Sequence, residues 1–115
     1  MLTFVRTVGD YEITYMMGKN QGENHPLIKN SEANDLWFHL HDRPSAHLVA
    51  QIASLTLSED EVTEMITYGI EILKERMKII EPTTIVMSHI KDLICLRTAG
   101  SIGYVKDSTQ YLRTL

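Results

Sequence analysis

Three histidines near the middle of the chain are the first candidates for chemistry. His39 and His41 are separated by one residue and followed by Asp42, so a strand would place both imidazoles on one face, a geometry that zinc enzymes use. The two-metal hydrolase pattern needs the aspartate two residues beyond the second histidine and another histidine directly after it, whereas Arg43 follows Asp42 here. No carboxylate or cysteine at ligand spacing completes a set. We therefore predict no bound metal and no cofactor.

Nucleophilic catalysis is also disfavoured by the sequence. Ser45 and His47 are alternate residues of a predicted strand, which places them on one face without requiring a hydrogen bond between them. The other serines and threonines lack the glycine-flanked elbow of hydrolases. Cys95, the single cysteine, has neither a cationic neighbour nor a helix start to lower its pKa, and its apolar neighbours predict a small buried residue. Glycine-rich phosphate loops are absent. We predict that the chain is not an enzyme.

The pattern around the histidines instead predicts a surface. Alternation from Leu36 to His41 predicts a strand, and alternation from Ser45 to Ile52 predicts a second one. If residues 42–44 form the loop between them, His39 lies opposite His47 and Trp37 opposite Val49, at about 5 Å between Cβ atoms. Leu36, Phe38 and Leu40 occupy the other face.

Two interpretations of this ring cluster remain open. The rings could simply fill a junction between sheet and loop. Alternatively, if the aliphatic face of the strand packs on a helix, the rings face outward or toward a covering loop. An exposed tryptophan with histidines, and with Arg43 and Lys19 nearby, would suit base stacking combined with phosphate contacts.

The elements that must position these residues follow from pattern and turn chemistry. Gly9-Asp10 predicts a two-residue hairpin turn with Val8 opposite Tyr11. Residues 18–26 are predicted to be a loop, followed by a short helix from Pro26 to Asn30. Ser58-Glu-Asp-Glu61 is a capping box that begins a long helix. Its apolar stripe runs to Ile80, and Pro82 ends it: Val62, Met65, Ile66, Gly69, Ile70, Leu73, Met77 and Ile80.

Beyond Pro82 the chain predicts short strands over residues 83–87, 93–97, 102–105 and 110–115, with a glycine-containing loop at 99–103. Hairpin strands with one long helix predict an α+β class, a mainly antiparallel sheet packed against an amphipathic helix. The length of 115 residues predicts one domain over residues 1–115.

Charge limits the classes of partner. The net charge of −4 argues against indiscriminate binding to a nucleic-acid backbone. However, residues 58–81 hold seven acids against three bases, so the excess negative charge belongs to the long helix and the rest of the chain is neutral. The lone cysteine, with no apolar stretch resembling a signal or membrane span, predicts a cytoplasmic protein with no membrane partner.

The chain resembles the NFACT-R domain family over nearly its whole length. The most specific match is Asp35-Leu-Trp-Phe-His39 followed by Pro44-Ser-Ala-His47. Further matches are Met17-Gly-Lys-Asn20, Glu23-Asn24, Ile85-Val-Met87 and Gly103-Tyr-Val105. The resemblance implies a non-catalytic RNA-binding domain. Such domains occur in ribosome quality-control factors, which hold tRNA on a split large ribosomal subunit, in prokaryotic proteins linked to tRNA thiolation, and in small eukaryotic coiled-coil proteins with one copy, which this chain resembles most.

The resemblance also implies which residues bind, and each has a structural alternative. Asn20 and Asn24 could cap turns, and Asp35 could cap a strand end or neutralise His39. Carried over by position, the implied nucleic-acid contacts are Lys19 and Asn20 on backbone or sugar, Asn24 holding the loop, Trp37, His39 and His47 as an aromatic floor, and Arg43 and Ser45 at its rim.

Two functional hypotheses follow. The first is an RNA-binding module for tRNA or ribosomal RNA, with the large ribosomal subunit as a candidate partner and the RNA lying away from the acidic helix. The second is an interaction or assembly module that docks a protein partner, or a second copy of the chain, through the acidic helix or a sheet edge.

Overall fold

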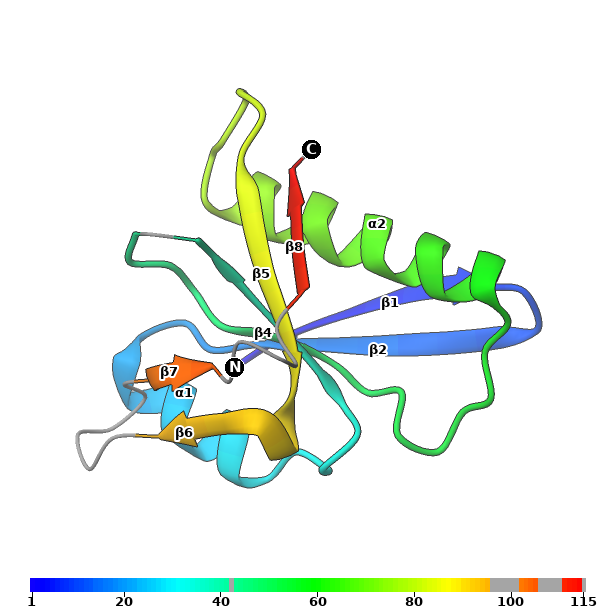
Figure 1. The fold of residues 1–115 in the computed structure, drawn as a ribbon, viewed down its shortest axis with the longest axis horizontal. Coiled ribbons are helices and arrows are strands. Elements are labelled where there is room, and N and C mark those ends of the chain that lie inside the picture. The colour runs from blue at the N-terminus through cyan, green and yellow to red at the C-terminus, as the bar shows by residue number, and fades with distance from the viewer. Residues whose placement is uncertain (42, 96–101, 106–110, 115) are drawn as a thin grey trace.

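The computed structural model describes residues 1–41, 43–95, 102–105 and 111–114 (Figure 1). The architecture is α+β, as the sequence predicted, with one long helix packed on a mainly antiparallel sheet. The strand order in the main sheet is β1-β2-β4-β3-β5-β8, and β6 and β7 form a second, two-stranded sheet. The elements are β1 (Leu2–Val8), β2 (Tyr11–Met17), α1 (Gln21–Lys29), β3 (Leu36–Leu40), β4 (Leu48–Ala50), α2 (Glu59–Arg76), β5 (Thr84–His89), the short 3-10 helix η1 (Ile90–Asp92), β6 (Leu93–Cys95), β7 (Ile102–Val105) and β8 (Tyr111–Thr114).

The N-terminal hairpin is confirmed in strands, turn and register. Val8 pairs with Tyr11. Gly9 has a φ of 58°, which glycine adopts without a steric penalty. Alternate residues on one face are buried or half-buried: Leu2, Phe4, Arg6, Val8, Tyr11, Ile13, Tyr15 and Met17.

The first helix begins earlier than predicted. The expected loop over residues 18–26 is wrong from Gln21 onward, because α1 already spans Gln21–Lys29 and contains Pro26 in its interior. The side chain of Asn20 accepts a hydrogen bond from the Glu23 backbone N–H at 3.1 Å and caps the helix. The proline has no N–H and therefore forgoes the intrahelical bond to the Gly22 carbonyl. An asparagine three positions before a glutamate is the signal that could have identified this helix start.

The β3–β4 hairpin has the predicted register, although β4 is shorter than expected. Trp37 pairs with Val49, and Phe38 pairs with Leu48. The predicted strand over residues 45–52 is reduced to Leu48–Ala50. At its start, the Ser45 hydroxyl accepts from the Leu40 N–H at 3.2 Å and donates to the Ala46 carbonyl at 2.8 Å. The hydroxyl thus bridges the two backbone groups that would otherwise bond directly, and the ladder ends there.

Helix α2 begins at the predicted capping box and ends before the predicted limit. The Ser58 and Glu61 side chains each accept from the other's backbone N–H. At the other end, Lys78 N–H bonds to the Glu75 carbonyl and Ile79 N–H to the Lys74 carbonyl, which is the Schellman arrangement. The helix therefore ends at Arg76, and Ile80, predicted to lie in its apolar stripe, is 96% exposed.

This helix end places a lysine where glycine is favoured. Lys78 has a φ of 57°, which costs a residue with a Cβ about 1 kcal/mol. Lys78→Gly is expected to raise the free energy of unfolding by about 0.5–1 kcal/mol in urea denaturation. The matched control is Glu71→Gly at an exposed interior position of the same helix, which should lower it by about 1 kcal/mol. Equal losses in both variants would contradict this account of the helix end.

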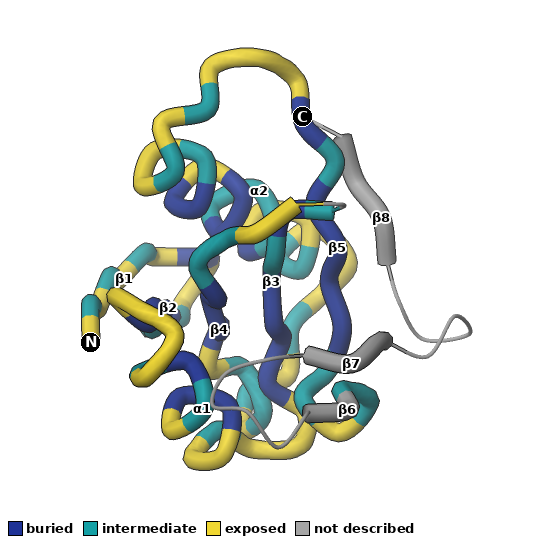
Figure 2. The backbone as a smooth tube through the Cα atoms, turned by 90° about the vertical axis from the view of Figure 1, so that its left-hand side faces the viewer, coloured by how far each residue is buried: buried dark blue, intermediate teal, exposed yellow. Residues whose placement is uncertain are grey.

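The sheet is covered on both faces, and its centre is the most buried part of the molecule (Figure 2). Helix α2 packs on one face, where Met65, Ile70 and Leu73 join the main core. A Cβ on Gly69 would lie 2.5 Å from Phe38 Cζ, so only glycine permits this close approach of helix and sheet. Leu27 and Ile28 of α1 cover the opposite face.

The later strands lie where the sequence predicted them, with β5 reaching His89 instead of residue 87. The expected loop at 99–103 and the side chain of Cys95 lie largely outside what the structure describes. Among the described helices, none is both long and apolar enough to cross a membrane.

Candidate functional site

Trp37, His39 and His47 form one cluster of rings at the end of β3, as the register predicted. The Trp37 and His39 rings stack with centroids 5.3 Å apart. The His47 ring meets both edge-on, at 5.7 Å from Trp37 and 5.0 Å from His39. The β3–β4 hairpin thus brings residues of β3 and of the segment before β4 to one point.

Of the two interpretations of the ring cluster, an exposed aromatic surface does not hold for two of the three rings, which fill the interior instead. Trp37 is 2% exposed and His47 is 5% exposed. Leu27 and Ile28, which lie in the predicted short helix Pro26–Asn30, pack over Trp37 on this face of the sheet, and His47 is buried beside Trp37. His39 is half-buried, so it is the one ring of the three that a ligand can reach without a rearrangement.

The hydrogen bonds fix the proton positions on both imidazoles. Trp37 Nε1–H is a donor only, so His47 Nδ1, 3.2 Å away, must accept and carry no proton. His39 Nδ1 lies 2.6 Å from the Leu40 carbonyl and therefore carries one. Burial lowers the pKa of His47 to about 4, with a smaller contribution from the neighbouring His39. Burial also lowers the pKa of His39, although its bond to Leu40 opposes the shift. Both rings are neutral near pH 7.

Asp35, the first residue of the distinctive motif, has a structural role. Its carboxylate accepts three backbone N–H bonds: from Glu32 at 2.9 Å, and from Ile52 and Ala53 at 3.0 Å each. The carboxylate is buried and joins the turn before β3 to the segment after β4. Of the two alternatives for Asp35, capping and neutralisation of His39, capping is the one the structure contains.

The loop before α1 lies against the ring cluster. Gly18 N–H donates to the His47 carbonyl at 3.3 Å. A Cβ on Gly18 would lie 2.2 Å from Asn24 Oδ1, so glycine is required for this contact. Asn24 is 7% exposed, and its Oδ1 has no hydrogen-bond partner within the described part of the chain. Asn24 therefore packs beneath the loop and is not available to a ligand on the surface.

Lys19 and Asn20 occupy the outside of this loop and are exposed. Asn20 uses its side-chain oxygen to cap α1, whereas the backbone of Lys19 donates to Glu23 Oε1 at 2.8 Å. This bond is the main reason that the pKa of Glu23 is lowered. The sequence marked Glu23 only as part of a motif, yet this residue holds the loop that displays the lysine side chain.

Arg43 is exposed at the turn between β3 and β4. This turn and the loop before α1 lie at the same end of the molecule, where both project beyond the sheet (Figure 1). Of the eight predicted contact residues, three are therefore exposed (Lys19, Asn20 and Arg43), two are half-buried (His39 and Ser45), and three are buried (Asn24, Trp37 and His47).

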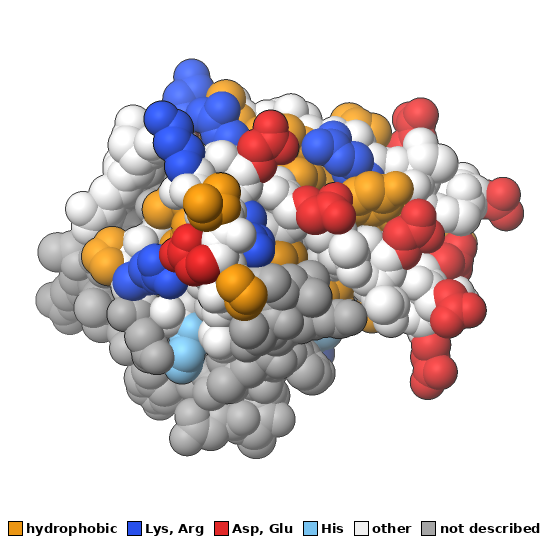
Figure 3. Space-filling model, turned by 90° about the horizontal axis from the view of Figure 1, so that it is seen from above, with side chains coloured by type: hydrophobic (Ala, Val, Ile, Leu, Met, Phe, Trp, Pro, Cys, Tyr) orange, Lys and Arg blue, Asp and Glu red, His pale blue; other side chains and the backbone are white. Residues whose placement is uncertain are grey.

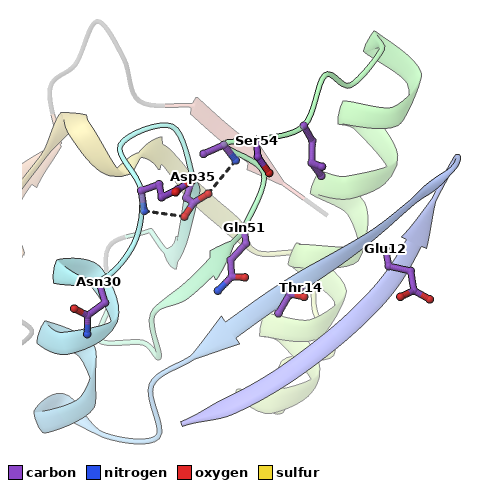
Figure 4. Close-up of a pocket in the computed structure, with 9 residues that line it drawn as sticks. Glu12, Thr14, Asn30, Asp35, Gln51 and Ser54 are labelled. Atoms are coloured by element: carbon purple, nitrogen blue, oxygen red, sulfur yellow. Dashed lines mark hydrogen bonds between the residues drawn. The ribbon is translucent and has the colours of Figure 1, made fainter.

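A separate polar hollow of about 420 Å³ lies beside the Asp35 carboxylate (Figure 4). Its walls come from β2, the end of α1 and the segments around residues 32–35 and 51–55, including Glu12, Thr14, Asn30, Glu32, Gln51 and Ser54. No contiguous motif marks it, because these segments meet only in the folded chain. Asp35 already spends its oxygens on backbone donors, so the polar groups left to line the hollow are two carboxylates, two amides and two hydroxyls.

Within the described residues, no group of three or more histidine, cysteine, aspartate or glutamate side chains is placed to hold a metal ion. What the cluster does chemically is hydrogen-bond and stack.

Comparison with known proteins yields a fold likeness only. No family model matches the chain, and no curated protein sequence matches it significantly. Among solved structures, the C-terminal part of a fibronectin/fibrinogen-binding protein from Streptococcus suis is similar, with a TM-score of 0.73 and 20% identity. The likeness covers 100% of this chain and 45% of that one. The chain thus spans less than half the length of that structure, and at this identity the likeness concerns the fold.

Proposed function

We propose that this chain is a non-catalytic RNA-binding module for tRNA or ribosomal RNA. The observation that carries the proposal is the Gly18–His47 hydrogen bond, which holds the Lys19 loop against the segment that leads back from Arg43. The loop that carries the exposed Lys19 and the turn that carries the exposed Arg43 thereby lie at the end of the molecule where the sequence also brings the half-buried His39 to the end of β3. Cations for phosphates beside a ring that can contact a base are the elements that recognition of single-stranded RNA requires.

The distribution of charge supports the same location. Seen from above, Asp and Glu side chains gather mainly on the right, at the end of the molecule with the start of α2 and the β1–β2 turn (Figure 3). Lys and Arg side chains lie mainly toward the left. A polyanion approaching this molecule is therefore steered away from the hairpin turn. The resemblance to the NFACT-R family, which rests on the motif of residues 35–47, points to the same class of ligand.

The burial found in the structure changes the roles assigned within the proposal. Trp37 and His47 act by positioning His39 and the Lys19 loop instead of touching RNA, and Ser45 shapes the turn that displays Arg43. Direct contacts are left to Lys19, Arg43 and His39, with Asn20 at the margin.

Binding to tRNA, a ribosomal RNA fragment and duplex DNA is the decisive measurement, made by filter binding across a range of salt. The Lys19→Ala/Arg43→Ala double variant is expected to bind RNA about tenfold more weakly at low salt. The slope of its salt dependence should be shallower by about 0.7 for each phosphate that the variant no longer neutralises. The matched control is Lys29→Ala/Lys91→Ala, which removes two exposed lysines elsewhere. If both double variants lose the same affinity, or the parent binds none of the three nucleic acids, the proposal is wrong.

A further inference from the structure

The polar hollow beside Asp35 is elongated, with one glutamate toward each end. Glu12 lies at one end and Asp35 at the other (Figure 4). Thr14 and Gln51 lie between them, where the Gln51 N–H donates to the Thr14 carbonyl at 2.9 Å. Glu32 belongs to the Asp35 end, because its N–H donates to the Asp35 carboxylate at 2.9 Å. Both glutamates line the hollow, and it therefore carries negative charge at two separate places.

The polar side chains that line the hollow have no partners in the protein. Within the described part of the chain, none of these six side chains forms a hydrogen bond or an ion pair: Glu12, Thr14, Asn30, Glu32, Gln51 and Ser54. Among the described residues, no lysine, arginine or histidine lines the hollow either. The hollow therefore presents negative charge without a counter-charge, together with amide and hydroxyl oxygens that are free to accept hydrogen bonds.

The separation of the two glutamates determines the kind of cation that fits. A metal ion needs ligand oxygens that converge to within about 2.6 Å of one point. No group of three histidine, cysteine, aspartate or glutamate side chains among the described residues is placed to do so. A single ammonium or guanidinium group likewise contacts only one end of the hollow. A ligand that contacts both glutamates must therefore carry two cationic groups joined by a spacer.

The other lining residues indicate the chemistry of that spacer. Ala53 and Leu55 add apolar surface to the wall, against which methylene groups can pack. Thr14 and Gln51 place a hydroxyl and an amide between the two ends, where their oxygens can accept from an amine inside the spacer. The volume of about 420 Å³ lies within the range of about 300–1,000 Å³ that is typical of small-molecule sites. An aliphatic chain interrupted by an amine therefore matches the wall.

We infer that the hollow binds a linear aliphatic polyamine. Its terminal ammonium groups pair with Glu12 and Glu32, one at each end of the hollow. Its methylene groups lie along the apolar part of the wall, and an inner amine donates to the side-chain oxygen of Gln51. Neither Lys19 nor Arg43 lines the hollow, so the inference goes beyond the proposed RNA interface and does not depend on it.

Titration of the chain with spermidine, without nucleic acid, tests the inference through amide chemical shifts in nuclear magnetic resonance spectra. The shifts are expected in the lining segments, residues 12–14, 30–35 and 51–55, and binding should weaken as salt is added. Butanediamine and octanediamine then separate length from charge, because both carry two ammonium groups. Octanediamine, which matches spermidine in length, is expected to bind about three- to fivefold more tightly than butanediamine, because only the longer chain reaches both glutamates.

Variants of the lining residues locate the ligand. Glu12→Gln and Glu32→Gln should each weaken spermidine binding about three- to fivefold and should abolish the preference for octanediamine over butanediamine. Gln51→Lys places an ammonium group between the two glutamates and should weaken binding about tenfold or more. The matched control is Glu75→Gln/Glu81→Gln, which removes two exposed carboxylates outside the hollow and should bind as the parent does. The far-ultraviolet circular dichroism and the melting temperature of each variant show that it is folded.

Three results would overturn the inference. The first is equal affinity of the parent for the two diamines. The second is undiminished spermidine binding by a folded Gln51→Lys variant, or a loss in the control variant as large as in the lining variants. The third is tighter binding of a peptide with two lysines separated by glycines, because the hollow would then hold side chains of a protein. Lys19→Ala/Arg43→Ala should bind spermidine as the parent does, so a failure of the RNA proposal leaves this test intact.

Discussion

Replacing Asp35 by alanine is expected to lower the free energy of unfolding by about 3 kcal/mol. The substitution leaves three backbone N–H groups, those of Glu32, Ile52 and Ala53, without their charged acceptor. An unsatisfied buried donor costs about 1–3 kcal/mol, and water from the adjoining hollow offsets part of the sum. Urea denaturation at neutral pH, with a constant m-value, measures the difference.

Two matched variants show whether the carboxylate is the cause. Asp35→Asn keeps one oxygen for Ile52 and Ala53 but cannot accept from Glu32, so a loss of about 1 kcal/mol is expected. Glu12→Ala removes an exposed carboxylate from the same hollow and should change stability by less than about 0.5 kcal/mol. If Asp35→Ala and Glu12→Ala are equally mild, Asp35 does not hold these segments together.

Acidification is expected to destabilise the protein through His47. The pKa of His47 is about 4 in the folded chain, against about 6.5 in an unfolded one. Between these values the unfolded state binds a proton that the folded state excludes, so stability is full above about pH 6.5 and falls as the pH is lowered toward 4. The difference of roughly 2.5 pKa units corresponds to about 3 kcal/mol over the whole window. His39, whose pKa is also lowered, acts in the same direction.

The variant His47→Asn isolates this contribution. An asparagine oxygen can accept from Trp37 Nε1, as His47 Nδ1 does, but it does not titrate. The parent should lose about 2 kcal/mol more than the variant between about pH 7 and pH 4.5, measured by urea denaturation. Carboxylates titrate in both proteins and cancel in the difference. Parallel pH profiles for the two proteins would show that protonation of His47 is not coupled to unfolding.

Protonation of His47 is also expected to release the loop that carries Lys19. Protonated His47 cannot accept from Trp37, and its carbonyl holds Gly18 of the Lys19 loop. Loss of the ring cluster in acid should therefore release this loop before the distant α2 capping box is affected. Hydrogen exchange of the Lys19 amide measures the order of this loop. An amide that is still protected at about pH 4.5 would contradict the coupling.

Local sequence signals determined much of the fold. The Gly9 turn, the Ser58 capping box and the register that places His39 opposite His47 all depend on neighbouring residues and on strand alternation, so the sequence alone was sufficient to predict them. The predictions failed where one local signal competes with another. Pro26 predicts a helix start although Asn20 supplies the cap, and Pro82 predicts the helix end although the chain turns at Lys78.

The sequence by itself also marked residues 35–47, which hold the ring cluster and the Asp35 carboxylate, and the neighbouring cations. Only the tertiary structure decided which of these residues a ligand can reach. Packing of α1 covers Trp37, His47 is buried beside Trp37, and three backbone donors from two segments take up the Asp35 carboxylate. Burial depends on what a distant part of the chain places over a residue, and alternation specifies only which face a side chain occupies. For that reason the most distinctive residues proved to be internal, whereas Lys19 and Arg43, the least distinctive in type, remain on the surface.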